Sequence, residues 1–406
     1  MPTATTTRPT GPTPRHRRRP GFSVQLALLV AMAFAIPAQL YLAIPIAGRV
    51  QTAYGIDAAS AAWTGAAFSF AYAIGFLVFG PLSDRVGRRP VLAIGALATA
   101  VITALVAAAP DFGWFLTGRV LQGFAAATFA PAALAHVTER APAARRPVAL
   151  SLLTTGLLGA GITGQVFGQL MAEHADWRAA FWPAAIGYAT AAAVLWRLLP
   201  PGSSGSAGSA VSVREVAKAA TALIRTRGPA AVFGSALAVF GSFVAFYAVL
   251  ERELRETSGL DADQLLLVQA VGAVGLLAGP LVNRRFGAKG PRTLAVAGYL
   301  TAAAGLLLAL LAQAAALTGV LIGVSVIFVA GTSLIVPGLV GLLHELAPHA
   351  RGTAGAVNTF VLFVGASTGQ LAAAQLGYRP MLTVLVLATL AAGLTVAVFT
   401  RSSSCP

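Results

Sequence analysis

Long apolar runs dominate this chain, and each is close to the roughly 20 residues that a helix needs to cross a bilayer. The runs are rich in Ala, Leu, Val and Gly, show no strand-like alternation, and are separated by Pro, Arg and Asp. Backbone groups in lipid must be paired internally, so only helices or closed barrels can span. The pattern predicts an all-α integral membrane protein with twelve transmembrane helices near 22–48, 60–82, 90–109, 113–137, 148–171, 178–199, 229–250, 263–283, 292–313, 317–343, 353–376 and 380–400.

The segments outside these spans divide the chain. Residues 1–21 are rich in Thr, Pro and Arg, which predicts a disordered cytoplasmic tail. Residues 200–228 begin with a Gly/Ser-rich stretch, typical of a flexible linker. This linker separates an N-terminal six-helix half, 22–199, from a C-terminal half, 229–400, and a short tail follows at 401–406. The first apolar run exceeds the roughly 7–15 residues of a signal peptide, so we expect it to remain as a span.

Composition supports a lipid environment. The chain is 57% hydrophobic and 10% charged, with a mean hydropathy of +0.78, whereas a soluble domain usually carries about 25% charged residues. The net charge of +15 would suggest nucleic acid in a soluble protein. Here the basic residues form short clusters between apolar runs without interleaved aromatics, so no nucleic-acid partner is expected. Cys405 is the only cysteine, which excludes an intramolecular disulfide.

The distribution of Lys and Arg predicts the orientation of the spans. Cytoplasmic loops carry an excess of these residues. With the N-terminus inside, most of the 28 Lys and Arg fall in predicted cytoplasmic segments. Five fall outside and one lies within a span: Arg49, Arg178, Arg252, Arg255, Arg379 and, in the span, Arg119. We therefore expect a multi-pass protein of the cytoplasmic (inner) membrane with both termini cytoplasmic.

Three pieces of the first half recur in the same order in the second. The segment 80–85 is echoed at 279–284, with Asn283 in place of the acid. The segment 141–145 is echoed at 347–351, and Thr163-Gly164-Gln165 at 368–370. A duplication in the same orientation implies two halves related by a pseudo-two-fold axis along the membrane normal. Such a pair leaves a cavity between the halves that rocking exposes to alternate sides.

The predicted loop between the second and third spans carries the most specific motif of the chain. An ordinary turn with cytoplasmic arginines would explain its glycines and its basic residues, but not the acid among them. The motif reads Gly80-x-x-x-Asp84-Arg85-x-Gly87-Arg88-Arg89. It resembles the signature loop of the major facilitator superfamily, and the chain is most like its twelve-helix drug/proton antiporter branch. The resemblance implies a conformational latch in which Asp84 engages the start of the eleventh span, near Arg351, where a helix N-terminus favours a carboxylate. The latch residues are Gly80, Asp84, Arg85, Gly87, Arg88 and Arg89.

A second motif lies in the fourth span. Arg119, Gln122 and Gly123 resemble the Arg-x-x-Gln-Gly motif of proton-coupled antiporters in the same superfamily. An arginine within a span is costly and marks a functional site by default. The alternative is a side chain that snorkels to the nearby surface. We take these three residues as candidates for proton coupling.

The fifth span is rich in glycine. It resembles the antiporter motif of efflux members of the superfamily, although Gln165 stands where that motif usually has proline. Small residues also let ordinary helices pack closely, so both interpretations stay open. The glycines are Gly156, Gly159, Gly161, Gly164 and Gly168.

Polar residues within the spans are the candidates for the substrate cavity. Each alone is more often a helix–helix hydrogen bond than a ligand contact. No Asp or Glu lies in the middle of a predicted span, and Glu251 at the outer end of the seventh is the remaining acidic candidate for coupling. The cavity candidates are Gln39, Tyr41, Gln165, Tyr247, Gln269 and Asn358.

These features favour a secondary active transporter that works by alternating access. The main hypothesis is proton-coupled efflux of small, partly apolar compounds or drugs by a monomer in the lipid bilayer. No nucleotide-binding loop is present, and neither a cofactor nor a metal site is expected. The nearest alternative is proton-coupled import of a sugar, amino acid or organic acid. A membrane enzyme is more remote: such enzymes usually need paired carboxylates or a histidine–acid set, and the one close acid–histidine pair, His344-Glu345, lies in a repeat-matched turn. A transporter-shaped sensor would be expected to carry an appended signalling domain, and none is evident.

Overall fold

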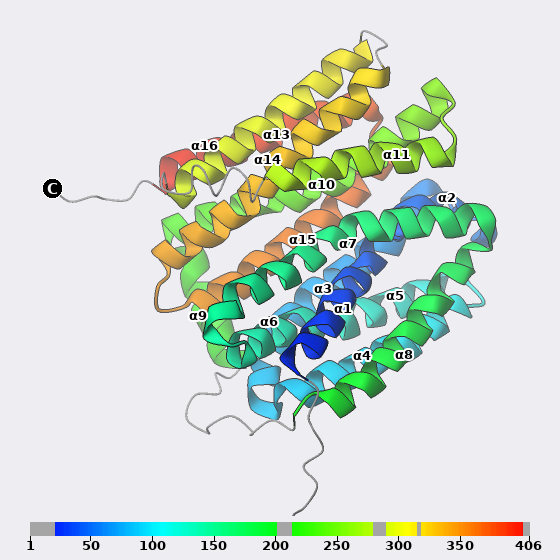
Figure 1. Ribbon diagram of the computed structural model, residues 1–406. Helices are drawn as coiled ribbons and strands as arrows, with labels where there is room; N and C mark the ends of the chain where they lie inside the picture. Colours follow the sequence, from blue (N-terminus) through cyan, green and yellow to red (C-terminus); the bar gives the residue numbers. More distant parts are fainter. Residues whose placement is uncertain (1–20, 201–212, 279–289, 315–317, 401–406) are drawn as a thin grey trace, which may run out of the picture.

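The computed structural model describes residues 21–200, 213–278, 290–314 and 318–400. This described part is helical, without strands (Figure 1). Within it, 11 helices are long and apolar enough to cross a membrane. The described part of the eighth expected span is helical from Ala262 and contains the shorter apolar stretch Leu267–Leu277. The remainder of this span lies outside the described residues, as does the repeat copy at 279–284. The predicted all-α membrane fold is confirmed.

Six spans form the first half. The first span is divided at Leu42, and the fourth is divided near Ala127. The elements are α1 (Phe22–Tyr41), α2 (Ala43–Tyr54), α3 (Ala58–Val86), α4 (Arg88–Ala107), α5 (Phe112–Ala126), α6 (Phe129–Arg140), η1 (Ala143–Arg145), α7 (Arg146–His174), η2 (Trp177–Ala180) and α8 (Phe181–Leu198).

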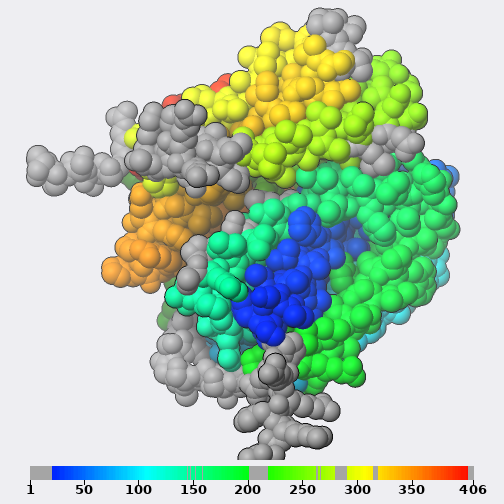
Figure 2. Space-filling view, viewed as in Figure 1, coloured from blue at the N-terminus to red at the C-terminus, as the bar shows by residue number. Residues whose placement is uncertain are grey.

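The second half repeats this plan after one additional helix in the linker. The elements are α9 (Val213–Arg225), α10 (Arg227–Ser258), α11 (Ala262–Ala273), η3 (Val274–Leu277), α13 (Pro291–Ala314), α14 (Thr318–Leu346), α15 (Arg351–Gln375) and α16 (Tyr378–Phe399). Figure 2 shows the blue-to-green residues gathered in one mass and the yellow residues in another.

The packing of the helices shows the internal repeat. In the first half α1 packs on α7, α3 on α5, and α4 on α8. In the second half α10 packs on α15, α11 and η3 on α14, and α13 on α16. Each pair of the first set corresponds, six spans later, to a pair of the second. The two halves are therefore built alike, as the sequence repeat predicts.

Short capping motifs start several helices at one end of the bundle. The Oδ1 of Asp57 accepts the backbone N–H of Ser60 at 2.7 Å, and Asp111 accepts that of Trp114 at 2.9 Å. Asp261 forms a capping box with Gln264. An Asp at this position satisfies one of the unpaired N–H groups of the first turn. We call the other end, where Gly87 joins α3 to α4, the loop end.

The two halves meet along two pairs of helices. The main contact is between α3 and α15, and a lesser one joins α7 to α11. Hydrogen bonds cross the main contact: Ser69 Oγ donates to the Phe363 carbonyl at 2.9 Å, and Ser367 Oγ to that of Ala66 at 3.2 Å. At the loop end α9 contacts α3, α10 and α15, and thus both halves.

Several helices extend beyond the predicted boundaries, and two of the differences bear on the site. α10 continues to Ser258, so Glu251 lies within a helix and does not end it. The i,i+4 ion pair between Glu251 and Arg255 stabilises this extension beyond the apolar stretch. The predicted linker contains α9, because Val213–Arg225 alternates apolar and basic residues at helical spacing. The structure does not describe 201–212 or the tails 1–20 and 401–406.

Candidate functional site

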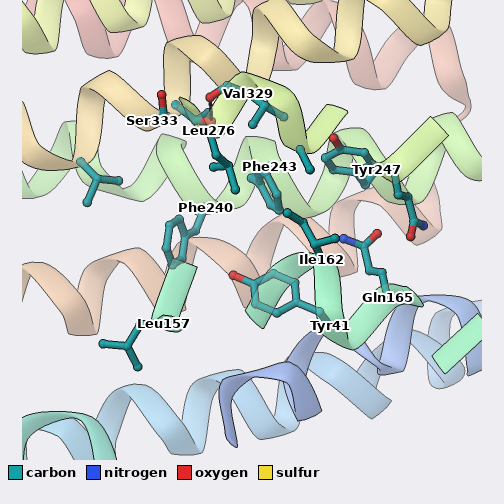
Figure 3. A pocket seen from close by; sticks show the side chains of 14 residues that line it. Tyr41, Leu157, Ile162, Gln165, Phe240, Phe243, Tyr247, Leu276, Val329 and Ser333 are labelled. Carbon is teal, nitrogen blue, oxygen red and sulfur yellow. Dashed lines mark hydrogen bonds between the residues drawn. The ribbon is translucent and has the colours of Figure 1, made fainter. Parts of the chain in front are cut away.

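A small cavity lies at the interface between the two halves, at mid-height of the bundle. We call it the central cavity. Its volume is about 60 Å³, which is far less than the roughly 300–1,000 Å³ of a typical ligand pocket. The walls come from α1, α7, α10, α11, η3 and α14 (Figure 3). The lining residues are Tyr41, Leu157, Ile162, Gln165, Phe240, Phe243, Tyr247, Gln269, Ala273, Leu276, Val329, Thr332, Ser333 and Val336.

Aromatic rings form one side of the central cavity. The rings of Tyr41 on α1 and Phe243 on α10 meet edge to face, with centroids 6.2 Å apart at 86°. Phe243 also contacts Tyr247, with centroids 5.1 Å apart. Because α1 and α10 belong to different halves, the contact between Tyr41 and Phe243 bridges the interface. A movement of one half against the other must break or shift it.

Two glutamine side chains supply polar atoms to the central cavity. Gln165 Nε2 donates to the Gly161 carbonyl at 2.9 Å, while its Oε1 is buried without a hydrogen-bond partner. Gln269 Oε1, from the other half, is likewise buried and unpartnered. By contrast, the hydroxyls of Thr332 and Ser333 donate to carbonyls of their own helix, α14. The fully buried polar atoms of this site that lack a partner are therefore two acceptor oxygens.

Four of the six cavity candidates from the sequence line this site: Tyr41, Gln165, Tyr247 and Gln269. The other two lie elsewhere. Gln39 is only two residues from Tyr41, so at 100° per residue the two side chains point to opposite faces of α1. Gln39 contacts Arg119 and Gln122 inside the first half. Asn358 is buried in α15, 2% exposed, with Oδ1 unpartnered.

A larger cavity, which we call the vestibule, lies at the end opposite the loop end. It measures about 610 Å³ and is lined by α2, α3, α7, α10 and α15. Gln169 and Glu251 line it, each four residues beyond a residue of the central cavity, Gln165 and Tyr247. Four residues make about one helical turn. The vestibule therefore sits directly above the central cavity along α7 and α10.

Charged residues of both signs line the vestibule. Glu251 Oε1 accepts a hydrogen bond from Arg255 Nη2 at 3.2 Å, while Glu251 Oε2 is buried and unpartnered. Arg252 Nη2 donates to the Leu376 carbonyl at 2.6 Å. Glu173, on α7, accepts from Gln169. The acids of the vestibule thus come from both halves.

Arg119 on α5 is fully buried, 0% exposed, inside the first half. Its Nε donates to the Thr64 carbonyl at 2.8 Å, Nη1 to Gln122 Oε1 at 2.6 Å, and Nη2 to the Gln39 carbonyl at 2.7 Å. The guanidinium also lies 4.7 Å from the centroid of the Phe68 ring. All three acceptors are neutral. The side chain does not snorkel, and it joins α1, α3 and α5.

Gln122 extends this cluster. Its Nε2 donates to Thr103 Oγ1 at 2.7 Å and to Gln39 Oε1 at 3.3 Å. Gly123 explains why the helices approach closely, since a Cβ there would lie 2.2 Å from the Phe68 carbonyl oxygen. The structure therefore brings Arg119, Gln122 and Gly123 together as one packed unit. Glu251 lies apart from them, on α10 of the other half.

The loop between α3 and α4 forms a chain of charges. Asp84 pairs with Arg88, and Arg88 Nη2 also pairs with Glu139 Oε1, at the end of α6, at 2.7 Å. Gly87 has a φ of 98°, a conformation that favours glycine. Arg89 lies 4.5 Å from the centroid of the Trp196 ring. The recorded partners of Asp84 thus lie within the first half, and its engagement with α15 stays a prediction.

Four of the five glycines of α7 pack against α1 or the start of α2. A Cβ at Gly156 would lie 2.9 Å from Ala33 Cβ, and one at Gly164 would lie 2.3 Å from the Ala38 carbonyl oxygen. A Cβ at Gly159 would lie 2.4 Å from the Phe34 ring, and one at Gly168 would lie 2.8 Å from Leu42 Cδ1 and from Pro45 Cγ on α2. Only Gly161 faces the central cavity, where a Cβ would make ordinary contacts with Tyr41 and Phe243 at 3.6 Å. The glycines form a packing ridge next to the cavity.

The whole arrangement consists of two similar halves, a cavity between them and a motif-bearing loop at one end. A model of the Major Facilitator Superfamily matches residues 27–370. The chain belongs to the major facilitator superfamily. The resemblance seen in the sequence is confirmed, and the members of this superfamily are transporters, which are not enzymes.

Curated relatives of this superfamily chain match over parts of their length. A puromycin resistance protein of Streptomyces alboniger is 35% identical over 130 residues, 32% of this chain and 26% of that protein. A chloramphenicol resistance protein of Pseudomonas aeruginosa is 35% identical over 127 residues, 31% of this chain and 30% of that protein. An inner membrane transport protein of Escherichia coli, YnfM, is 27% identical over 45% of this chain and 44% of that protein. The matched stretches span less than half of these relatives.

Solved structures share this fold over nearly the whole chain. A bacterial homologue of the human lysosomal transporter Spinster aligns with a TM-score of 0.74 at 16% identity, covering 95% of this chain and 100% of that chain. A D-xylose-proton symporter aligns with a TM-score of 0.71 at 19% identity, covering 94% and 98%. At such identities these likenesses describe the fold alone.

Sequence reasoning missed several residues of this transporter's cavities. Phe240 and Phe243 precede Tyr247 at the i−7 and i−4 positions of α10, so helical spacing places all three on one face. The same face continues to Glu251 in the vestibule. Glu139 was missed for another reason. It is distant in sequence from the loop motif that it contacts, and nothing local marks it.

Proposed function

We propose that this transporter works by alternating access and exports small, partly apolar compounds in exchange for protons. The observation that carries the proposal is the central cavity, which lies between two like halves directly below the vestibule. Rocking of the halves would open it to one end of the bundle at a time. Export is supported by relatives whose names record puromycin and chloramphenicol resistance.

We further propose that the loop end faces the cytoplasm in the inner membrane and that the vestibule opens outside. The positive-inside rule supports this orientation: Arg85, Arg88 and Arg89 lie at the loop end. With α9 contacting both halves there, the halves are held together at the loop end and apart at the vestibule. This arrangement corresponds to the state that releases substrate and takes up protons.

Protons enter this mechanism through the vestibule. Glu251 is its best-placed carrier, because Oε2 is buried and unpartnered while Oε1 contacts Arg255. Protonation of Oε2 would weaken the ion pair and give the free oxygen a proton to donate. Arg119 has neutral partners and lies in the other half. Its part in coupling is to hold the helix that carries Tyr41 in position, through the Gln39 carbonyl.

The test of the proposal is proton flux in energised inverted membrane vesicles that contain the full chain. A panel of antibiotics, amphipathic cations and small metabolites is added in turn. A compound that dissipates the pH gradient only when the protein is present identifies a proton-coupled exporter. Movement of sugars, amino acids or organic acids in uptake assays, with none in the vesicle assay, would instead identify the importer that the sequence left as an alternative.

Substitution Glu251→Gln is expected to abolish substrate-dependent proton flux, because the amide cannot take up and release a proton. Substrate binding should persist, since Glu251 lies one turn above the central cavity. The control is Glu256→Gln, an exposed acid of the same helix that also lines the vestibule, and this variant should retain coupling. Normal flux in the Glu251→Gln vesicles would show that the proton travels by another residue.

Substitution Asp84→Asn is expected to slow transport about tenfold, which corresponds to a change of about 1.4 kcal/mol in the preference between states. The amide loses the charge that pairs with Arg88, while helix α3 and the amount of protein in the membrane should be unchanged. The matched control is Asp57→Asn, because asparagine caps a helix as well as aspartate does. If the Asp84→Asn variant transports as fast as the Asp57→Asn control and the wild type, the latch hypothesis is wrong.

A further inference from the structure

The two unpartnered oxygens of the central cavity are unusual for such buried groups. Gln165 is 2% exposed and Gln269 is 5% exposed, yet Oε1 of each lacks a hydrogen-bond partner. The orientation of the Gln165 amide follows from the bond that its Nε2 donates to the Gly161 carbonyl, which leaves the oxygen free. Buried polar atoms in proteins are nearly always paired, and each exception needs an explanation. A ligand that donates hydrogen bonds would provide the missing partners.

The surroundings of these oxygens restrict the charge of such a ligand. None of the described residues that line the central cavity is Asp, Glu, Lys or Arg. A cation would enter without a carboxylate to balance it, and cation–π contacts with the aromatic wall recover only part of the cost of burying an isolated charge. An anion would meet two acceptor oxygens and no positive side chain. The site therefore suits an uncharged molecule.

The aromatic residues of the central cavity restrict the shape of such a ligand. Tyr41, Phe243 and Tyr247 present their rings at the cavity wall, and Phe240 adds a fourth ring from the same face of α10. Aromatic side chains prefer offset-stacked or edge-to-face contacts with other rings. A flat aromatic group placed among them gains such contacts in several orientations. Its substituents could then reach the glutamines on α7 and α11.

We propose that the central cavity binds an uncharged aromatic compound that donates N–H or O–H hydrogen bonds to Oε1 of Gln165 and Oε1 of Gln269. This inference rests on the proposed function, since it names the substrate class of the same site. Gln165 belongs to one half of the transporter and Gln269 to the other. One ligand with two donors therefore joins the halves, and its presence changes the balance between the states. The cavity of about 60 Å³ must widen to admit it.

The experiment measures equilibrium binding to the purified full chain in lipid nanodiscs, so that it does not depend on transport. The donor-bearing probe is 6-hydroxy-2-naphthamide. The matched probe without donors is 6-methoxy-N,N-dimethyl-2-naphthamide, and the charged probes are 2-naphthylmethyltrimethylammonium and 2-naphthoate. The wild-type protein should bind the donor-bearing probe at least about tenfold more tightly than each of the others, as expected for one hydrogen bond or more.

The variants locate the effect. Gln165→Leu and Gln269→Leu should each weaken binding of the donor-bearing probe by about tenfold and leave the donor-free probe unchanged. The control is Gln370→Leu, because Gln370 is the repeat counterpart of Gln165, is 6% exposed and also has an unpartnered Oε1, but lines the vestibule. This variant should bind both probes as the wild type does. The comparison of probes on wild-type protein stands even if a variant fails to fold.

Two results would overturn the inference: tighter binding of the ammonium or naphthoate probe, or equal binding of the donor-bearing and donor-free probes. If vesicles show proton-coupled export of cations alone, the proposed function stands and the substrate class is wrong. If the donor-bearing probe binds through both glutamines but moves no protons, the substrate class stands and proton-coupled export fails.

Discussion

Replacing Arg119 with alanine is expected to abolish proton-coupled transport and to lower the thermal stability of the purified protein. The substitution leaves the carbonyls of Thr64 and Gln39 and the amide oxygen of Gln122 without their donors. Each buried acceptor left unpaired costs about 1–3 kcal/mol. Because the cluster fixes the segment of α1 that carries Tyr41, the wall of the central cavity should shift as well. Thermal unfolding and vesicle proton flux are the two measurements.

Arg119→Lys separates the charge from the geometry. Lysine keeps the positive charge but lacks the planar fork that reaches three acceptors on three helices. We expect this variant to have a thermal stability between those of the wild type and Arg119→Ala, and strongly reduced transport. The control, Arg145→Ala, removes an exposed arginine at the loop end and should match the wild type in both measurements. An Arg119→Ala protein as stable and active as the wild type would show that the cluster is dispensable.

The spans and the repeat could be predicted from the sequence because both depend on local properties. A run of apolar residues fixes where a helix crosses lipid, whatever its neighbours. The repeat is visible because the packing of α7 on α1 recurs as that of α15 on α10. A Cβ at Gly164 would lie 2.3 Å from the Ala38 carbonyl oxygen, and one at Gly369 would lie 2.2 Å from that of Gly241. The matched sequence segments thus occupy matched positions.

The candidate site was predictable only in part, because its residues come together from distant helices. In the sequence, Gln39 and Gln165 cannot be told apart, because both are polar residues within predicted spans. Only the rotation of each helix, set by tertiary packing, places Gln165 at the cavity and Gln39 against Arg119. The vestibule could not be predicted either, because the sequence suggested that α10 ends near Glu251.

Replacing Gly164 with valine is expected to prevent normal folding, as judged by the amount of protein in the membrane and by its thermal stability. The added side chain would meet the backbone of Ala38, which cannot rotate away as a side chain can. Overpacking a core costs about 1–3 kcal/mol, occasionally more, and contact with backbone on a neighbouring helix belongs at the upper end. Helices in lipid depend on such close approach, because hydrophobic burial does not hold them together.

The control for this substitution is Gly187→Val on α8, where nothing lies within 4 Å of a built Cβ, and it should leave stability unchanged. Gly369→Val tests the repeat, since the same clash arises against Gly241 in the second half. We expect Gly164→Val and Gly369→Val to be equally severe, because each separates the first and fifth helices of its half. A tolerated Gly164→Val beside a damaging Gly369→Val would show that the two halves depend on different contacts. The glycines of α7 would then serve movement of the helix more than its packing.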